Sequence, residues 1–369
     1  MTSKLAAIIL CALLFGALIS SCTINRQAQT IDSSLADLRN KLDSEQMIER
    51  QFPFAIREFD PYLDGKWIGQ AVSYGCYREG QAPWGDGPSK AEILEDLNII
   101  KAHWNLIRVY NADDDTQNIL EVIRANALPI KVMLGIWLEN EDNKPAAKSS
   151  NIHNILRGIE LCKRFPEIIR AVNVGNETQV YWSGHRLRQE ALIRYIRAVR
   201  SHIDAPVTTA DDYNFWNKQE SKAVADELDF IVTHIYPLWN GKTLANAISW
   251  LDDTYDEVAR VHPYKHLVLG EIGWATNYNP DKKGDGEQGT LIKGEVSVSA
   301  QEEFLFELDA WINAHKITTF LFEVFDEPWK GGGEASGTNE IEKNWGLFYM
   351  NRSPKLSFIN YLAAKNLTD

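Results

Sequence analysis

Short apolar segments alternate with longer amphipathic segments along the chain from residue 67 onward. The apolar segments are rich in Val, Ile and Leu and have the length of buried strands. We predict eight of them, at Trp67–Ser73, Asn105–Tyr110, Ile130–Ile136, Ile168–Val174, Pro206–Ala210, Phe230–Ile235, His266–Leu269 and Thr318–Phe322. Eight buried strands that alternate with helices favour one α/β fold, the (β/α)8 or TIM barrel.

The amphipathic segments between these strands have the apolar spacing of helices. Ser89 follows a proline and precedes Glu92, an arrangement that favours the start of a helix. We predict helices at Ser89–Ala102, Thr116–Ala125, Asn151–Arg164, Arg186–His202, Leu244–Val261 and Ala300–Ala314.

The first residues have the layout of a lipoprotein-type signal peptide. Lys4 precedes an apolar stretch, Leu5–Ile19, that is short for a bilayer-spanning helix. The following Ser20-Ser21-Cys22 is similar to the end of the bacterial lipobox, in which cleavage precedes a lipidated cysteine. We therefore predict removal of residues 1–21, lipid attachment at Cys22, and export to a bacterial cell envelope, at the outer membrane or the cell surface. The alternative is an uncleaved anchor helix.

Residues 22–60 are expected to separate this lipid from a folded domain at residues 61–369. Ile31, Leu35, Leu38 and Leu42 recur at helical steps in an otherwise polar segment. The pattern predicts one amphipathic helix that serves as a spacer, or alternatively as an extra helix packed on the barrel.

Composition and charge restrict the partners of this domain. The chain has 369 residues, of which 44% are hydrophobic and 24% charged, as in soluble globular proteins. A net charge of −13 and the lack of a Lys/Arg cluster argue against nucleic acid, whose binding requires neutralisation of phosphates. A neutral substrate and a monomer are expected. Outside the leader and Cys22, Cys76 and Cys162 are predicted to be free thiols.

Two predicted strands lead into a carboxylate. Ile168–Val174 is followed by Gly175-Asn176-Glu177, and His266–Leu269 by Gly270-Glu271. The carboxyl ends of barrel strands share one rim, so Glu177 and Glu271 are expected to face each other there. Two such carboxyls are sufficient for glycoside hydrolysis, in which one protonates the leaving oxygen and the other attacks the sugar or activates water. Each motif alone is equally consistent with a structural ion pair.

Other polar residues near these strand ends are candidates for supporting roles. Asn176 is expected to hydrogen-bond a sugar hydroxyl, and the Tyr236 hydroxyl to hold the nucleophilic carboxylate in place. His234 is expected in the polar network below the carboxylates, with a role as base or metal ligand as the alternative. No histidine pair has the HExxH-type spacing of a metal site, and His262 and His266, although four apart, lie in a turn that leads into a strand, so we predict no metal.

The eighth strand ends in a dense group of charges. Glu327 and Lys330 are candidates for substrate contact, whereas Glu323 is expected to pair with Arg108 at the barrel mouth. Tyr110, at the end of the second strand, is included among the supporting residues.

Tryptophans near the strand ends favour a sugar ligand, because an indole face suits the C–H face of a pyranose. Core packing is the alternative for each one alone. The two long Gly-containing loops, Asn279–Val298 and Trp329–Asn344, are expected to wall the substrate groove. The tryptophans that fall at or just after predicted strand ends are Trp137, Trp182, Trp216, Trp239, Trp274 and Trp329.

Several motifs, in order, resemble the family 17 glycoside hydrolases over about residues 68–354. They are Val174-Gly175-Asn176-Glu177, Gly270-Glu271-Ile272-Gly273-Trp274, Phe322-Glu323-Val324-Phe325-Asp326-Glu327-Pro328-Trp329-Lys330 and Trp345-Gly346-Leu347-Phe348. Ile272, Ala275 and the opening segment at residues 73–81 resemble the microbial branch of the family, some members of which are transglycosylases.

The resemblance implies hydrolysis of β-1,3-glucans such as laminarin with retention of configuration. It implies that Glu177 is the acid/base and Glu271 the nucleophile, and that no cofactor is needed. Further positions that match the family's site are Tyr74, Asn176, Tyr236, Glu327, Lys330 and Glu342. A β-1,3-glucanosyltransferase with the same residues is the nearest alternative, and a non-catalytic glycan-binding lipoprotein is a remote one.

Overall fold

The computed structural model describes residues 34–142, 144–281, 288–331 and 340–365. The chain divides into two compact units, Met1–Glu49 and Arg50–Asp369. In the first unit, residues 34–43 form a helix that contains Leu35, Leu38 and Leu42 of the predicted amphipathic pattern. The expected signal peptide and lipid attachment site lie outside the described residues. None of the helices in the described ranges is long and apolar enough to cross a membrane.

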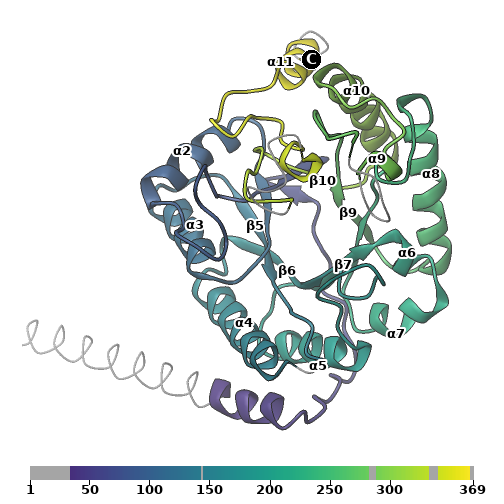
Figure 1. The fold of residues 1–369 in the computed structure, drawn as a ribbon. Coiled ribbons are helices and arrows are strands. Elements are labelled where there is room, and N and C mark those ends of the chain that lie inside the picture. The colour runs from purple at the N-terminus through teal and green to yellow at the C-terminus, as the bar shows by residue number, and fades with distance from the viewer. Residues whose placement is uncertain (1–33, 143, 282–287, 332–339, 366–369) are drawn as a thin grey trace, which may run out of the picture. The chain divides into compact units, whose positions relative to one another are not determined.

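The second unit is built on a closed barrel of parallel strands, with helices around the outside (Figure 1). This confirms the predicted (β/α)8 fold. The barrel order is β10-β3-β4-β5-β6-β7-β8-β9. The strands are β3 (Gln70–Ser73), β4 (Leu106–Val109), β5 (Lys131–Ile136), β6 (Ile169–Asn176), β7 (Val207–Asp212), β8 (Ile231–His234), β9 (Leu267–Ile272) and β10 (Thr319–Leu321).

All eight predicted strands are present, and the differences lie at their ends. Trp67 is not part of β3 but belongs to a small antiparallel hairpin, β1 (Tyr62–Leu63) and β2 (Lys66–Trp67). The strands β6, β7 and β9 extend further than predicted and include Asn176, Asp212 and Glu271. The predicted strands end before Gly or Asp residues, but in the barrel these added residues continue to pair with at least one neighbouring strand.

The predicted helices are also present. Ser89 accepts a hydrogen bond from the backbone of Glu92, and the Glu92 carboxylate accepts one from the backbone of Ser89, a reciprocal cap. The helices are α2 (Lys90–Ile100), α3 (Asp114–Ala125), α4 (Pro145–Arg164), α5 (Gln189–Arg200), α6 (Tyr213–Trp216), α7 (Lys222–Ala225), α8 (Leu244–Val261), α9 (Gln288–Leu291), α10 (Val298–His315) and α11 (Leu356–Lys365), with 3-10 turns η1 (Gln219–Ser221) and η3 (Ile341–Lys343).

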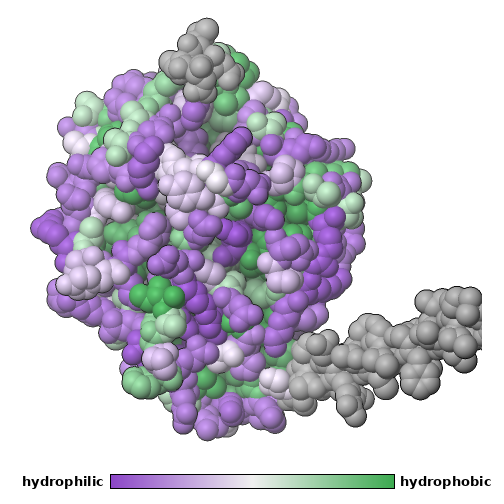
Figure 2. All heavy atoms as spheres, turned by 180° about the vertical axis from the view of Figure 1, so that it is seen from behind, coloured by the Kyte–Doolittle hydropathy of each residue, from purple (hydrophilic) through white to green (hydrophobic). Residues whose placement is uncertain are grey.

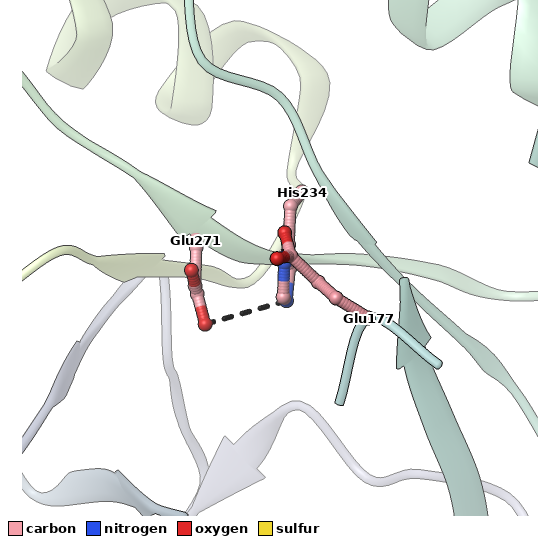
Figure 3. A group of neighbouring side chains, drawn as sticks. All are labelled: Glu177, His234 and Glu271. Carbon is pink, nitrogen blue, oxygen red and sulfur yellow. Dashed lines mark hydrogen bonds and ion pairs between the residues drawn. The ribbon is translucent and has the colours of Figure 1, made fainter. Parts of the chain in front are cut away.

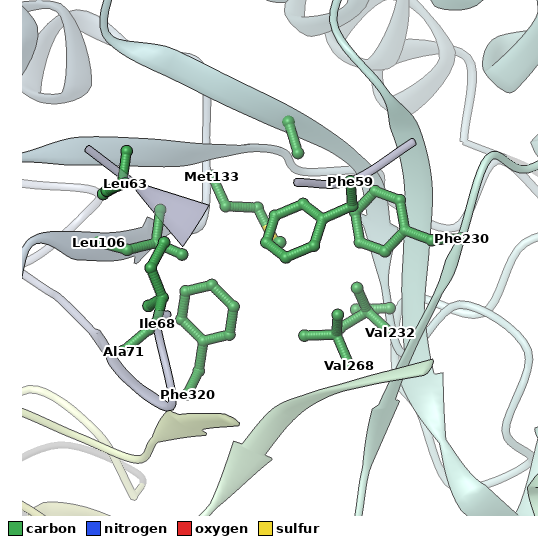
Figure 4. Close-up of a cluster of buried hydrophobic side chains, with 12 residues drawn as sticks. Phe59, Leu63, Ile68, Ala71, Leu106, Met133, Phe230, Val232, Val268 and Phe320 are labelled. Atoms are coloured by element: carbon green, nitrogen blue, oxygen red, sulfur yellow. The ribbon is translucent and has the colours of Figure 1, made fainter. Parts of the chain in front are cut away.

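The barrel interior is filled by apolar side chains, one or more from every strand (Figure 4). Phe59, Leu63 and Ile68, which precede β3, belong to the same cluster. Phe59 stacks on Phe230 at the start of β8, with ring centroids 4.9 Å apart. The segment before β3 therefore closes the amino-terminal end of the barrel. For this reason residues 50–60 belong to the barrel unit, although the sequence placed them in the spacer.

Polar residues cover most of the face shown in Figure 2, and hydrophobic residues lie between them in small separate groups. The two remaining cysteines, Cys76 and Cys162, are buried and free, as predicted. Cys162 lies in α4, and Cys76 lies in the loop after β3.

Candidate active site

The two predicted carboxylates meet at the carboxyl-terminal rim of the barrel (Figure 3). Glu177 directly follows β6, whereas Glu271 lies within β9. One carboxylate oxygen of each lies within 4.8 Å of the other and of a ring nitrogen of His234. This upper limit on the oxygen–oxygen distance fits the roughly 5–5.5 Å between carboxyl groups of retaining glycosidases, and is shorter than the roughly 6.5–9.5 Å of inverting ones.

Glu271 is buried among hydrogen-bond donors. Its Oε1 accepts bonds from Arg108 Nη1 at 2.5 Å and from the Tyr110 hydroxyl at 3.1 Å, and its Oε2 accepts one from the Tyr236 hydroxyl at 2.8 Å. Burial alone would raise the pKa of Glu271, but His234, Arg108 and Tyr236 outweigh it and lower the pKa to about 2. The carboxylate is therefore ionised and held in one orientation, as a nucleophile requires.

Glu177 lies in a different environment. Its side chain is 27% exposed, compared with 7% for Glu271. Its backbone has a φ of +48°, a left-handed conformation that is uncommon outside glycine and is often found at functional sites. Gly175, two residues earlier, also has a positive φ, of +81°. The tight turn after β6 therefore points this carboxyl into the cavity, where solvent and a ligand reach it.

Arg108 connects Glu271 to Asn176. Its Nη2 donates to Asn176 Oδ1 at 2.5 Å, and its side chain is fully buried. The expected pair between Arg108 and Glu323 is therefore wrong. Arg108 extends from β4 to the carboxylate of β9, and Glu323 has another cationic partner.

That partner is Lys330. Its Nζ lies 2.7 Å from Glu323 Oε2 and 2.7 Å from Glu327 Oε2. Burial opposes the charge on Lys330, but these two carboxylates raise its pKa well above the usual value. Glu327 and Lys330 line the cavity, as do Glu342 and Tyr74.

Tyr74 has a largely structural environment. Its hydroxyl donates to Asp96 at 3.1 Å, and Asp96 also pairs with Arg78 and Arg352. The hydroxyl is therefore already used in a buried network, although Tyr74 also lines the cavity.

Two further carboxyls face the same cavity. Removal from bulk water raises the pKa of Glu342 to about 7, and the charges of Glu177 and Glu271 add to this effect. Burial likewise raises the pKa of Asp212, the last residue of β7, to about 6. Sequence analysis missed Asp212 because the strand was ended at Ala210, although two consecutive aspartates at a strand end were a usable signal.

The cavity has a volume of about 1710 Å³ and is lined by many aromatic rings. Among the predicted tryptophans, four line it, namely Trp137, Trp182, Trp239 and Trp329. Trp216 and Trp274 do not. They are buried in the core, where their indole N–H groups donate to Val232 and Glu295 carbonyls at 3.0 and 2.8 Å. For these two, core packing was the correct interpretation.

Sequence analysis also missed two lining tryptophans. Trp84, 76% exposed, makes an edge-to-face contact with Trp329, with centroids 5.5 Å apart. Trp345 lies in the Trp-Gly-Leu-Phe motif and contacts the Tyr236 ring. Parts of the two long loops, residues 282–287 and 332–339, lie outside the described residues, but Thr290, Leu291 and Trp329 from these loops line the cavity.

The Glu177, His234 and Glu271 group also has the spacing of a three-ligand metal site. However, Glu271 already accepts hydrogen bonds from cationic Arg108 and from two tyrosines. A second cation beside Arg108 would be repelled, so we assign no metal to these residues.

Comparisons with known proteins identify similar glucan-hydrolysing proteins. The chain is 27% identical over 282 residues to a glucan 1,3-beta-glucosidase of Schizosaccharomyces pombe, covering 72% of this chain and 79% of the relative. It is 26% identical over 284 residues to the glucan endo-1,3-beta-glucosidase btgC of Emericella nidulans, covering 73% of this chain. It spans less than half the length of the btgC relatives, 42% in that case.

The fold is similar to that of an endo-laminarinase from Formosa Hel1_33_131, with a TM-score of 0.69, 23% identity, and 81% of this chain and 88% of the other covered. These matches confirm the resemblance to family 17 glycoside hydrolases. The profile of the BtgE/BtgC glycoside hydrolase domain matches residues 71–346, which include both rim glutamates. The chain therefore belongs to the BtgE/BtgC glycoside hydrolase domain family.

Proposed function

We propose that this domain hydrolyses β-1,3-linked glucans such as laminarin with retention of configuration. The observation that carries the proposal is the pair of carboxyl groups of Glu177 and Glu271, with one oxygen of each within 4.8 Å of the other, in an aromatic-lined cavity. Glu271 is buried and ionised, whereas Glu177 is partly exposed. The names of the glucan 1,3-beta-glucosidase relatives support the choice of linkage.

In the proposed mechanism Glu271 attacks the anomeric carbon while the bond to the glycosidic oxygen breaks. The bonding electron pair stays with that oxygen, which takes the proton of Glu177. In the second step Glu177 removes a proton from water as the water oxygen attacks the same carbon, and the ester bond to Glu271 breaks. Both steps invert configuration, so the product retains it.

The cavity supports a substrate longer than one sugar. Its volume of about 1710 Å³ exceeds the roughly 300–1,000 Å³ of typical small-molecule sites. Arg108 and Tyr236 orient the nucleophile Glu271. The exposed tryptophans of the rim bind the substrate by stacking on its sugar rings.

A time course on laminarin and short β-1,3-glucan oligosaccharides tests the function. We expect a ladder of shorter products, with the β-anomer formed first when the reaction is followed by proton NMR. A first-formed α-anomer would exclude the retaining mechanism. Binding of laminarin without any turnover would instead favour the non-catalytic glycan-binding alternative.

A β-1,3-glucanosyltransferase remains the second candidate. Tyr181 and Trp182, 81% and 47% exposed, lie in the loop after Glu177 and line the cavity. Such rings offer a surface on which an acceptor sugar could replace water in the second step. Products longer than the starting oligosaccharide, at high substrate concentration, would identify transfer.

We also propose that the enzyme is a lipoprotein of a bacterial cell envelope, anchored through Cys22. The proposal rests on the basic, apolar and small-residue order of the first residues. In a bacterial host, Cys22→Ser is expected to move the protein from the detergent-soluble membrane fraction to the aqueous fraction or to leave the leader uncleaved. Cys11→Ser, within the predicted leader, is the control, and equal behaviour of the two variants would contradict lipid attachment at Cys22.

A further inference from the structure

His234 contacts both rim glutamates (Figure 3). Its Nδ1 is 3.1 Å from Glu177 Oε1, and its Nε2 is 3.5 Å from Glu271 Oε1. The ring is fully buried, and Nε2 has no hydrogen-bond partner among the described residues. One imidazole therefore contacts both carboxyl groups of the proposed reaction.

The strand register explains this position. Thr233 pairs with Leu269, whereas the next residue, His234, pairs with Glu271, so Gly270 of β9 is passed over by β8. A Cβ atom at Gly270 would lie 2.2 Å from Val232 Cγ1 and 3.1 Å from His234 Nε2. Glycine at this position is therefore what allows the imidazole ring to lie against Glu271.

The two carboxylates depend on this ring to different degrees. Glu271 has three other donors, whereas among the described residues His234 is the one side chain within hydrogen-bond distance of the Glu177 carboxylate. The charged neighbours on the β7 side are Asp211 and Asp212, which both interact with the charge of Glu177; Asp212 also pairs with His234 in the strand register.

The negative charge of the site moves during a retaining reaction. Before attack Glu271 is ionised and Glu177 carries a proton, whereas in the glycosyl-enzyme Glu271 is an ester and Glu177 is ionised. A neutral imidazole donates a hydrogen bond from one ring nitrogen and accepts one at the other. An imidazole at this position is thus next to the ionised carboxylate in each half of the reaction.

We propose that His234 is a positioning residue for both half-reactions, acting on Glu271 through Nε2 during attack and on Glu177 through Nδ1 during hydrolysis of the ester. This inference rests on the proposed function. It assigns to one side chain two separable effects, one through each nitrogen.

Two amide substitutions separate these effects. His234→Asn places an amide near the Nδ1 position and retains a partner for Glu177, whereas His234→Gln places one near Nε2 and retains a partner for Glu271. With a dinitrophenyl β-laminaribioside, we expect His234→Asn to slow formation of the glycosyl-enzyme by about 10- to 100-fold, because the close polar contact to the Glu271 carboxylate is lost. We expect His234→Gln to slow its hydrolysis instead, so that the covalent intermediate accumulates as a larger burst.

The pH profile gives a second readout. Loss of the N–H beside Glu271 removes a contact that favours the ionised form, so the acidic limb of kcat/KM should move to higher pH in His234→Asn. The matched control is His262→Asn, since His262 is also buried but bonds Ser221 Oγ and the Trp216 carbonyl, both at 2.9 Å. We expect this control to alter Tm without changing either step.

A structural role alone would give a different result. If both His234 variants slowed the two steps by the same factor, or lowered Tm with the burst and pH limbs unchanged, the inference would be overturned. Ring nitrogen NMR of His234 in Glu177→Gln and Glu271→Gln provides a test without substrate, because each change should alter a different nitrogen signal. Inactivity of the wild type on every β-1,3-glucan would reject the proposed function, while unchanged nitrogen signals would reject the contacts.

Discussion

Glu271→Gln is expected to lower kcat on laminarin on the order of 10⁵-fold, the largest effect of any single change that we predict. The amide keeps the shape of the side chain and can still accept a hydrogen bond from Arg108, but it is not a nucleophile. The measurement is release of reducing ends from laminarin, with Tm recorded in parallel to verify folding.

Glu227→Gln is a matched control for this change. Glu227 is also a buried carboxylate paired with an arginine, Arg197, at 2.7 Å, but it lies outside the cavity. We expect its kcat to stay near that of the wild type. Normal turnover by Glu271→Gln would show that another group is the nucleophile.

Glu177→Ala is expected to have an effect that depends on the leaving group. On laminarin, whose departing hydroxyl requires a proton, loss of the acid should lower kcat/KM by about 10²- to 10⁴-fold. On a dinitrophenyl glycoside, which leaves without protonation, formation of the glycosyl-enzyme should stay near the wild-type rate. Its hydrolysis should become slow because no base activates water.

Azide distinguishes this role from general damage to the site. A small anionic nucleophile needs no base and fits in the space left by the carboxyl, so it should restore turnover of the dinitrophenyl glycoside and yield a β-glycosyl azide. The same treatment should not accelerate Glu271→Gln or the wild type. Equal loss on both substrates, without rescue, would contradict the assignment of Glu177 as acid/base.

Local patterns were sufficient to predict the scaffold. Each barrel strand is buried on both faces, so it appears in the sequence as a short continuous run of apolar residues and can be recognised from adjacent residues alone. The cap at Ser89 was predicted for the same reason, since both of its hydrogen bonds join residues three apart. The strand that carries Glu271 was predicted too short, because a glycine such as Gly270 usually marks the end of a strand. In the structure Gly270 lies at a register shift between β8 and β9, and this pairing cannot be inferred from neighbouring residues in the chain.

The direction in which each tryptophan ring points could not be predicted from the sequence. Position after a strand places an indole near the rim, but it does not say whether the ring turns toward the cavity or the helices. Trp137 and Trp239 turn toward the cavity, whereas Trp216 and Trp274 pack in the core. The same uncertainty affects Tyr74, whose hydroxyl bonds Asp96 of α2.

The (β/α)8 fold and the placement of Glu177 and Glu271 at one rim could be predicted from the sequence, because strand ends in a parallel barrel all face the same way. The contacts between charged groups could not be predicted in this way. Arg108 contacts Glu271 and not Glu323, and His234 lies between the two carboxylates. These contacts join residues far apart in the chain, so they depend on the register in which the strands close, a quantity that no local pattern encodes.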